Sequence, residues 1–219
     1  PVKLGKRLDI KLLIWYYCVM IRIIGKIPHT VTIACSGGID SMAFSHFLQS
    51  GRRNINLAYF NHDTQHSYKA QKFVENYASL NNLNLFIGRV QGRKGKRSLE
   101  EFWRDERYAF LQRISSNYII TCHHLDDCVE TWLMSSFHGR SKLIPYQRNE
   151  NIFRPFLMTT KSTISKYAKN KGINWIEDPS NQKTNFMRNH VRQNVMPQVL
   201  VVNPGIRSTI RKKLIETYL

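Results

Sequence analysis

The stretch Ala34-Cys35-Ser36-Gly37-Gly38-Ile39-Asp40-Ser41 decides the fold. It ends a short β-branched run at Val31–Cys35 and precedes a helical pattern, so it predicts a strand, a tight glycine turn and the start of a helix. Two adjacent glycines let the backbone turn sharply and approach an anion closely. The amides of such a turn, aided by the helix dipole, point at a bound phosphate. The stretch therefore predicts a phosphate-binding loop, and no lysine follows its second glycine as in a Walker loop.

The rest of the first 137 residues repeats this alternation of strand and helix. Further strands are predicted at Ile55–Asn61, Leu83–Arg89 and Tyr118–Cys122, and amphipathic helices at residues 70–78, 99–114 and 125–137. Apolar strands separated by single helices are typical of a doubly wound, parallel α/β sheet. In such sheets, ligands bind at the carboxyl ends of the strands.

The chain of 219 residues is expected to have three parts. Residues 1–27 should form an N-terminal helix around the apolar run Leu12–Ile21, which is too short to span a bilayer and lacks a clear cleavage site. Residues 28–158 should form the α/β domain. Residues 159–219 should form a small, basic helical extension of the same catalytic unit, after a polar, turn-rich stretch at 138–155.

The charge is strongly one-sided. Lys and Arg number 33 against 15 acids, a net charge of +18, and residues 140–219 hold 15 of the bases but only four acids. Such an excess favours a polyphosphate partner over a merely solubilising surface, because neutralised phosphates release counterions. The four cysteines form no C-x-x-C pair, so zinc or a disulfide framework is poorly supported and a reducing compartment is expected.

A second motif stands where the last predicted strand meets a helix, at residues 121–131. Asp127 and Glu130 are three apart and share a helix face, which suits Mg²⁺ beside phosphates. His123 or His124 is suited to phosphate contact or proton transfer near neutral pH. The alternative is a capped helix with acids in its first turn.

Two basic motifs complete the set. Arg104 and Arg107 are one turn apart in the helical stretch 98–108, where ion pairs with Glu100, Glu101 and Glu106 are an equal alternative. Arg188 and Arg192 share a face downstream of the turn Asp178-Pro179, and this spacing predicts a phosphate clamp. A basic helix without a ligand is the alternative, more credible for Arg192 than for Arg188.

These motifs resemble known families. The string S-G-G-x-D-S at residues 36–41 resembles the PP-loop of the ATP pyrophosphatases. The strings at residues 98–108, 121–131, 152–157 and 173–181 with 186–192 resemble, in order, the E-x-x-x-R-x-x-R-Y, H-H-x-x-D-x-x-E-T, R-P-L-L and W-x-E-D-P-S-N with R-N-x-x-R patterns of the tRNA(Ile)-lysidine synthetases. The resemblance covers about residues 28 to 200. Asp63 and Gln65 depart from the family's N-H-G-x-R motif, and the C-terminal tRNA-binding domains of many bacterial members are expected to be missing.

The resemblance implies an activity. ATP and Mg²⁺ would adenylate C2 of the wobble cytidine in a tRNA with a CAU anticodon, and the ε-amine of free L-lysine would then displace AMP. Alternatives are a tRNA thiolase of the same superfamily, or an inactive nucleic-acid-binding protein. The expected location is the cytoplasm or an organellar matrix or stroma, without a membrane partner.

The resemblance also assigns roles. The implied catalytic residues are His123, Asp127, Arg104, Arg188 and Asp40, the implied ATP-binding residues are Ser36, Gly37, Gly38, Asp40, Ser41 and His62, and the implied metal ligands are Asp127 and Glu130.

Overall fold

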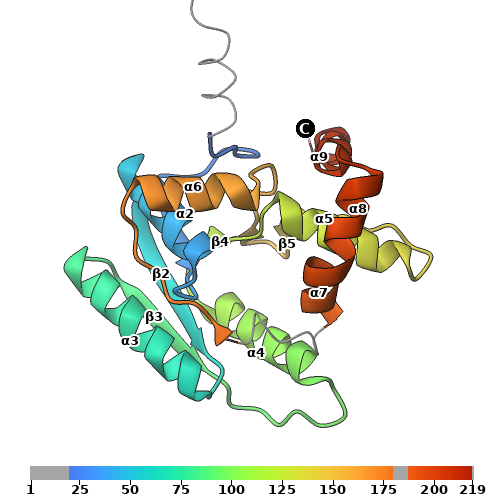
Figure 1. Ribbon diagram of the computed structural model, residues 1–219. Coiled ribbons are helices and arrows are strands. Elements are labelled where there is room, and N and C mark those ends of the chain that lie inside the picture. The colour runs from blue at the N-terminus through green and yellow to red at the C-terminus, as the bar shows by residue number, and fades with distance from the viewer. Residues whose placement is uncertain (1–19, 180–186, 219) are drawn as a thin grey trace, which may run out of the picture.

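The structure, a computed structural model, describes residues 20–179 and 187–218, and these ranges contain a six-stranded sheet with helices on both faces (Figure 1). The strands are β1 (Thr30–Ala34), β2 (Asn54–Asn61), β3 (Leu85–Arg89), β4 (Ile119–Thr121), β5 (Gln147–Arg148) and β6 (Ile152–Phe153). Their order is β3-β2-β1-β4-β6-β5, and every pair is parallel except β5 with β6. The predicted doubly wound, parallel α/β fold is confirmed, except that an antiparallel hairpin forms one edge of the sheet.

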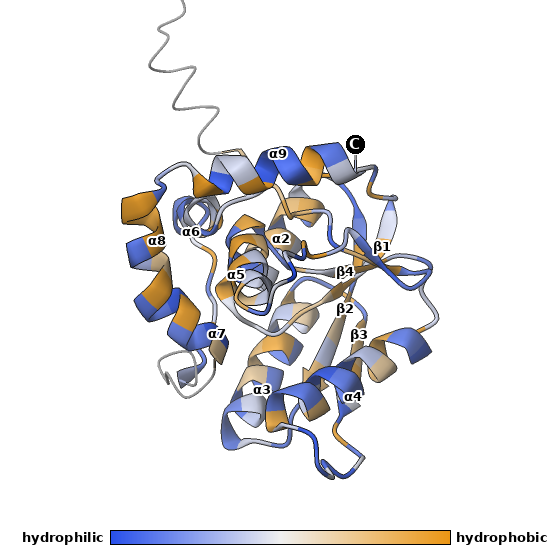
Figure 2. Ribbon diagram, turned by 90° about the vertical axis from the view of Figure 1, so that its right-hand side faces the viewer, coloured by the Kyte–Doolittle hydropathy of each residue, from blue (hydrophilic) through white to orange (hydrophobic). Residues whose placement is uncertain are grey.

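Alternating side chains of the strands build a core on each face of the sheet. Helices α2 (Ile39–Ser50), α3 (Gln65–Leu80) and α6 (Lys161–Asn170) cover one face. Leu57 and Tyr59 of β2 point into that core, whereas Ala58 and Phe60 point into the core beneath α4 (Leu99–Arg113). Figure 2 shows apolar residues on the central strands and hydrophilic residues on much of α3 and α4.

A third core joins the C-terminal helices to the sheet domain. Helix α5 (Leu125–Ser136) packs against α9 (Ile206–Tyr218) and α8 (Met196–Val202), and buried Leu125, Val129 and Leu214 lie between them. A short helix α7 (Met187–His190) and a π-helical turn, η2 (Val191–Val195), lead into α8. No helix in the described part of the chain is long and apolar enough to cross a membrane.

The strand order creates a switch point between β1 and β4. From β1 the chain moves outward to β2 and β3, then returns through α4 to β4 on the other side of β1. The loops after β1 and β4 therefore lead into helices on opposite faces, which opens a crevice at the carboxyl ends of these strands. The register pairs Ala34 with Thr121, so both loops leave the sheet at the same edge.

Residues 20–27 correct one expectation, because they are not helical. Arg22 donates its N–H to Thr159 Oγ1 at 2.9 Å, and Ile24 donates to Pro155 O at 2.8 Å. These amides bind distant residues in place of the carbonyls four positions earlier that a helix would need. The remainder of the expected N-terminal helix, residues 1–19 with Cys18, lies outside the described residues.

The β5–β6 hairpin was not predicted from the polar stretch at 138–155. Its strands have two residues each, whereas a readable strand pattern needs about 4–8 residues. The hairpin is fixed by its neighbours, since Ile119 donates its N–H to Asn151 O at 2.7 Å as β6 joins β4.

Candidate active site

The loop after β1 forms a tight cradle of amides and hydroxyls. Gly37 adopts a left-handed backbone with φ of +78°, and Gly38 is the N-cap of α2. Ser41 Oγ accepts a hydrogen bond from the Ser36 N–H at 3.2 Å and donates one to Gly38 O at 2.9 Å. The loop thus presents amides and two hydroxyls at a helix N-terminus, an arrangement that binds phosphate.

A distant segment packs on this turn. Ile176 donates its N–H to Gly37 O at 2.9 Å, and its Cγ2 lies 3.1 Å from where a Cβ on Gly37 would stand. Ile176 belongs to the predicted motif at 173–181, of which Ser180 and Asn181 lie outside the described residues. The described part of this motif therefore forms a wall of the Ser36–Ser41 loop.

The loop after β4 lies beside the loop after β1. His124 Nε2 is 3.8 Å from Asp40 Oδ1, across the switch point. His124 also caps α5, because its N–H donates to Asp127 Oδ2 at 2.9 Å while its Nδ1 accepts from the Asp127 N–H at 3.3 Å. The capped-helix interpretation therefore holds for His124, and the same cap fixes the Asp127 carboxylate beside the His124 ring.

Two acids at this edge are bound by cations from helices α6 and α9. Lys161, the first residue of α6, places Nζ 2.7 and 2.8 Å from the two oxygens of Asp40. Asp126 accepts the Lys161 N–H at 2.7 Å and Arg207 Nε at 2.7 Å, so it ties α6 and α9 to α5. No local pattern marks Lys161, because Asp126 and Asp40 lie 35 and 121 residues away from it.

The predicted acid pair faces the predicted arginine pair. Arg192 Nε and Nη2 lie 2.7 and 2.9 Å from the two oxygens of Glu130, and Arg188 Nε lies 3.2 Å from the same carboxylate. Asp127 Oδ1 is 3.4 Å from Arg192 and 3.8 Å from Arg188. The two arginines share a face, as their spacing predicted, but that face binds acids of the chain itself.

These contacts decide which of the expected Mg²⁺ ligands, Asp127 or Glu130, is free to bind a metal. The described residues contain no group of three or more His, Cys, Asp or Glu side chains that could hold a metal ion. Both oxygens of Glu130 are bound by arginine, so Glu130 does not fit a metal in this arrangement. Asp127 Oδ1 has only longer contacts and fits the single carboxylate that Mg²⁺ takes beside phosphates. Burial would raise the pKa of Asp127, but His124 and Arg188 hold that pKa well below its usual range.

His123 is a neutral imidazole at physiological pH. Burial lowers its pKa well below the ordinary value, and Arg154 and Arg188 lower it further against the opposing influence of Asp127. Its Nδ1 lies 3.1 Å from Thr121 Oγ1. Such an imidazole is a weak base, so it suits hydrogen bonding or a brief proton transfer better than holding a proton.

His62 lies at the carboxyl end of β2, against α4. Its ring centroid is 5.1 Å from that of Trp103, and its Nδ1 is buried without a hydrogen-bond partner among the described residues. Burial, with the nearby Arg107, lowers the pKa of His62 to about 4. Asp63, which replaces the resembled family's glycine, has a φ of +60°. Aspartate adopts this left-handed conformation more readily than most residues, so the turn can form with Asp63 in place of glycine.

Arg104 and Arg107 surround a tyrosine of their own helix. Their guanidinium carbons lie 5.1 and 5.7 Å from the centroid of the Tyr108 ring. No ion pair joins either arginine to an acid within residues 20–179 and 187–218, so the alternative of exposed pairs with Glu100, Glu101 and Glu106 is wrong there. Glu106 instead accepts the N–H groups of Gln91 and Gly92, both at 3.2 Å.

Comparisons with known proteins show the family of this chain. A family model described as PP-loop domain matches residues 20–199. A tRNA(Ile)-lysidine synthase from Persephonella marina is 34% identical over 196 residues, which cover 82% of this chain and 43% of the relative. One from Haemophilus ducreyi is 31% identical over 192 residues, 83% and 45% of the two chains. The chain spans less than half the length of these two curated relatives.

A solved structure shares the fold. The U34-tRNA thiolase NcsA from Methanococcus maripaludis, with its 4Fe–4S cluster, superposes with a TM-score of 0.69 at 14% identity, over 91% of this chain and 74% of that one. At this identity the likeness concerns the arrangement of strands and helices.

Proposed function

This chain belongs to the PP-loop domain family, and we propose that it is a tRNA(Ile)-lysidine synthetase, which activates a tRNA cytidine with ATP and joins lysine to it. Relatives carrying that name match it at 34% and 31% identity. Because the chain spans less than half of their length, the complete activity is a proposal for this chain. The substrates are ATP, free L-lysine and a tRNA with a CAU anticodon.

One observation supports the proposal above the others. The Ser36–Ser41 loop and the loop that carries His123 and Asp127 meet at the β1–β4 switch point, where His124 Nε2 is 3.8 Å from Asp40. A phosphate-binding turn and an ionised carboxylate at one sheet edge are what nucleotidyl transfer requires.

The reaction divides into two displacements. The amides of Gly37 and Gly38 and the hydroxyls of Ser36 and Ser41 hold the ATP phosphates, and the cytidine C2 oxygen attacks the α-phosphate and expels pyrophosphate. The lysine ε-amine, in its neutral form, then attacks C2 and expels AMP. A Mg²⁺ ion held by Asp127 would neutralise charge on the leaving pyrophosphate.

Other side chains of the site position the reactants. His123 is neutral, and the charge of Asp127 favours its protonated form, so it can briefly accept the proton that the attacking amine loses. Asp40 and Glu177 are two acids of the motifs that could orient the substrate lysine. Asp40 already binds an ammonium group, that of Lys161, at 2.7 and 2.8 Å, whereas Glu177 is exposed. Asp40 is therefore the better candidate to orient the substrate lysine, after its ion pair with Lys161 has broken. Arg104 supplies positive charge for the RNA or the nucleotide, and Arg188 does so once it releases Glu130.

The thiolase alternative gains no support from the described thiols. Burial raises the pKa of Cys35 and Cys128 and raises the pKa of Cys122 well above its ordinary value. Protonated, buried thiols are poor nucleophiles and poor cluster ligands.

The decisive experiment incubates the chain with ATP, radiolabelled lysine and tRNA bearing a CAU anticodon. Label stable to mild alkali should enter the tRNA, with one AMP released per lysine. Asp127→Asn should lower this incorporation at least 100-fold while tRNA affinity changes less than twofold. Asp105→Asn, an exposed aspartate on α4, is the matched control and should behave as the wild-type chain does.

Two other outcomes would reject the proposal. Incorporation of sulfur in place of lysine would identify a thiolase. Binding of tRNA without any AMP formation by the wild-type chain would identify an inactive binding protein.

A further inference from the structure

An unbalanced cluster of arginines surrounds Tyr108. Arg104 and Arg107 come from the same helix, while Arg148 of β5 lies over the tyrosine ring, 3.9 Å from its centroid. Arg154, just after β6, donates from Nη2 to the Tyr108 hydroxyl at 3.1 Å. None of these four arginines forms an ion pair with an acid in the two described ranges.

The arginine cluster lowers the stability of the free protein. Arg154 is only 1% exposed, and its Nε is buried without a partner among the described residues. A buried guanidinium that lacks an anion is destabilising, and four like charges around one ring repel each other. The nearby acids of α4 do not help, since Asp105 binds Arg97 at 2.9 Å and Glu106 binds backbone amides of residues 91 and 92. An external anion would relieve this imbalance.

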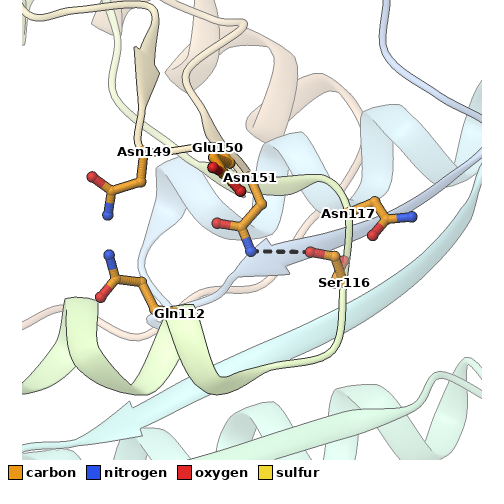
Figure 3. A pocket seen from close by; sticks show the side chains of 6 residues that line it. All are labelled: Gln112, Ser116, Asn117, Asn149, Glu150 and Asn151. Carbon is orange, nitrogen blue, oxygen red and sulfur yellow. Dashed lines mark hydrogen bonds between the residues drawn. The ribbon is translucent and has the colours of Figure 1, made fainter.

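A polar depression continues this face along α4. Gln112 follows Tyr108 by one helical turn and lines a cavity of about 790 Å³ with Ser116, Asn117, Asn149, Glu150 and Asn151. In Figure 3 the amides of Gln112 and Asn149 face each other, and Asn151 Nδ2 donates to Ser116 O at 3.1 Å. Amide side chains can donate and accept together, as the edges of nucleobases require.

The order of these features suggests a polymer as ligand. Helix α4 runs from the carboxyl edge of the sheet, where β3 ends, to the amino end of β4. Arg104 and Gln112 are eight residues apart, about 12 Å along a helix axis. Arginines therefore stand nearer the Ser36–Ser41 loop, and amides stand farther from it. Glu150 in the depression disfavours a phosphate there and leaves an uncharged base as the better fit.

We propose that the face formed by α4 and the β5–β6 hairpin binds the RNA strand next to the reacting nucleotide, with a phosphodiester at Arg148 and a flanking base in the amide-lined depression. This inference rests on the proposed function and extends it to residues outside the nucleotide site. The ligand is single-stranded RNA, whose unstacked bases are open to hydrogen bonding and whose phosphates suit arginine.

The test measures both RNA affinity and stability of the Arg148→Ala chain. An RNA hairpin with a CAU loop should bind the variant about 5- to 10-fold more weakly by fluorescence anisotropy, and the slope of log affinity against log salt should fall by about 0.7, the value of one phosphate contact. The melting temperature of the free variant should stay equal or rise, because one of four repelling charges is gone. Lys72→Ala, an exposed cation on α3 over the opposite face, should change the affinity less than twofold.

The remaining outcomes are equally informative. A lower melting temperature with unchanged RNA affinity would show that Arg148 is structural and would overturn the inference. Gln112→Ala should abolish discrimination among hairpins that differ in one base flanking the anticodon, and undiminished discrimination would overturn the placement of the base. If the wild-type chain binds the hairpin but does not incorporate lysine, the proposed function fails while this surface stands.

Discussion

Gly37 is under two constraints that matched substitutions can separate. Its φ of +78° disfavours any side chain, and a Cβ would also stand 3.1 Å from Ile176 Cγ2. Gly139 has nearly the same φ, +75°, but nothing lies within 4 Å of its would-be Cβ. Gly139→Ala should lower the free energy of unfolding by about 1 kcal/mol through backbone strain alone. Gly37→Ala should cost about 2 kcal/mol or more and weaken ATP binding at least 10-fold.

Urea unfolding and ATP titration check this pair. Equal losses of stability with ATP affinity intact in both variants would mean that the contact with Ile176 does not shape the loop.

His62 should make the stability depend on pH. Its pKa in the folded chain is about 4, whereas a histidine in an unfolded chain titrates near 6.5. Between these two pKa values the imidazole is protonated in the unfolded state and neutral in the folded state. The free energy of unfolding therefore falls as the pH falls from 6.5 towards 4. Above pH 6.5 His62 has no effect on it. The loss between pH 7 and pH 5 should be about 2 kcal/mol.

His62→Phe keeps a ring against Trp103 and removes this titration. Urea unfolding at pH 7 and pH 5 should therefore show a smaller pH effect in His62→Phe than in the wild-type chain, while His138→Phe, at an exposed position, leaves the effect unchanged. An identical pH response in all three chains would refute a depressed pKa at His62.

An ion pair between Arg192 of η2 and Glu130 of α5 joins a half-exposed side chain to a buried one. The Glu130 side chain is 3% exposed and its partner Arg192 is 43% exposed, whereas both members of the Arg97–Asp105 pair are at least 40% exposed. The N–O distances are similar, 2.7 and 2.9 Å. Double-mutant cycles should give a coupling of about 1–2 kcal/mol for Glu130 with Arg192 and below about 0.5 kcal/mol for the exposed pair.

Salt provides the contrast within that experiment. In 1 M NaCl the coupling of Arg97 with Asp105 should vanish, while most of the Glu130–Arg192 coupling persists because a half-buried pair is screened less. Equal sensitivity to salt would contradict the burial of Glu130.

Helix α9 is held on α5 by one apolar stripe. Leu214 is fully buried in that interface, whereas the adjacent Ile215 is 42% exposed. Leu214→Ala should lower the free energy of unfolding by about 2–4 kcal/mol, and Ile215→Ala by less than about 1 kcal/mol. Hydrogen exchange should also speed up in α9 of the Leu214→Ala chain before it does in the central strands; uniform acceleration would mean that α9 does not open separately.

Long periodic segments could be predicted from sequence, whereas short ones could not. The pattern at residues 125–137 anticipates α5 at Leu125–Ser136, and the helical extension expected at 159–219 contains α9 at Ile206–Tyr218. Strands β5 and β6 have two residues each and exist only because β4 offers them a hydrogen-bonding edge. The helix predicted at residues 20–27 is absent for a related reason. Backbone amides of this segment donate to residues more than 130 positions away.

The sequence predicts that the loops of the site lie at one edge of the sheet, but it does not predict the ion pairs that join distant segments there. Parallel strands bring their carboxyl ends to one edge, so the Ser36–Ser41 loop and His123 could be expected near each other. That β1 and β4 are direct neighbours follows from the complete strand order, which no local pattern contains. The ammonium of Lys161 on Asp40, the arginines on Glu130 and the cluster around Tyr108 all join segments far apart in the chain, so they emerge only on folding.

The net charge of these 219 residues should govern how they bind RNA. With a net charge of +18 and four arginines around Tyr108 that lack acid partners in the described residues, binding of a single strand should release several counterions. If about five phosphates are neutralised, the affinity for an unstructured RNA should fall about 100-fold between 50 and 200 mM salt. Affinity for ATP should fall less, because the Ser36–Ser41 loop binds phosphate through amides and hydroxyls and not through an excess of cations. Anisotropy titrations with both ligands over this range provide the measurement, and an RNA affinity that is as insensitive to salt as that for ATP would show that the excess charge serves solubility alone.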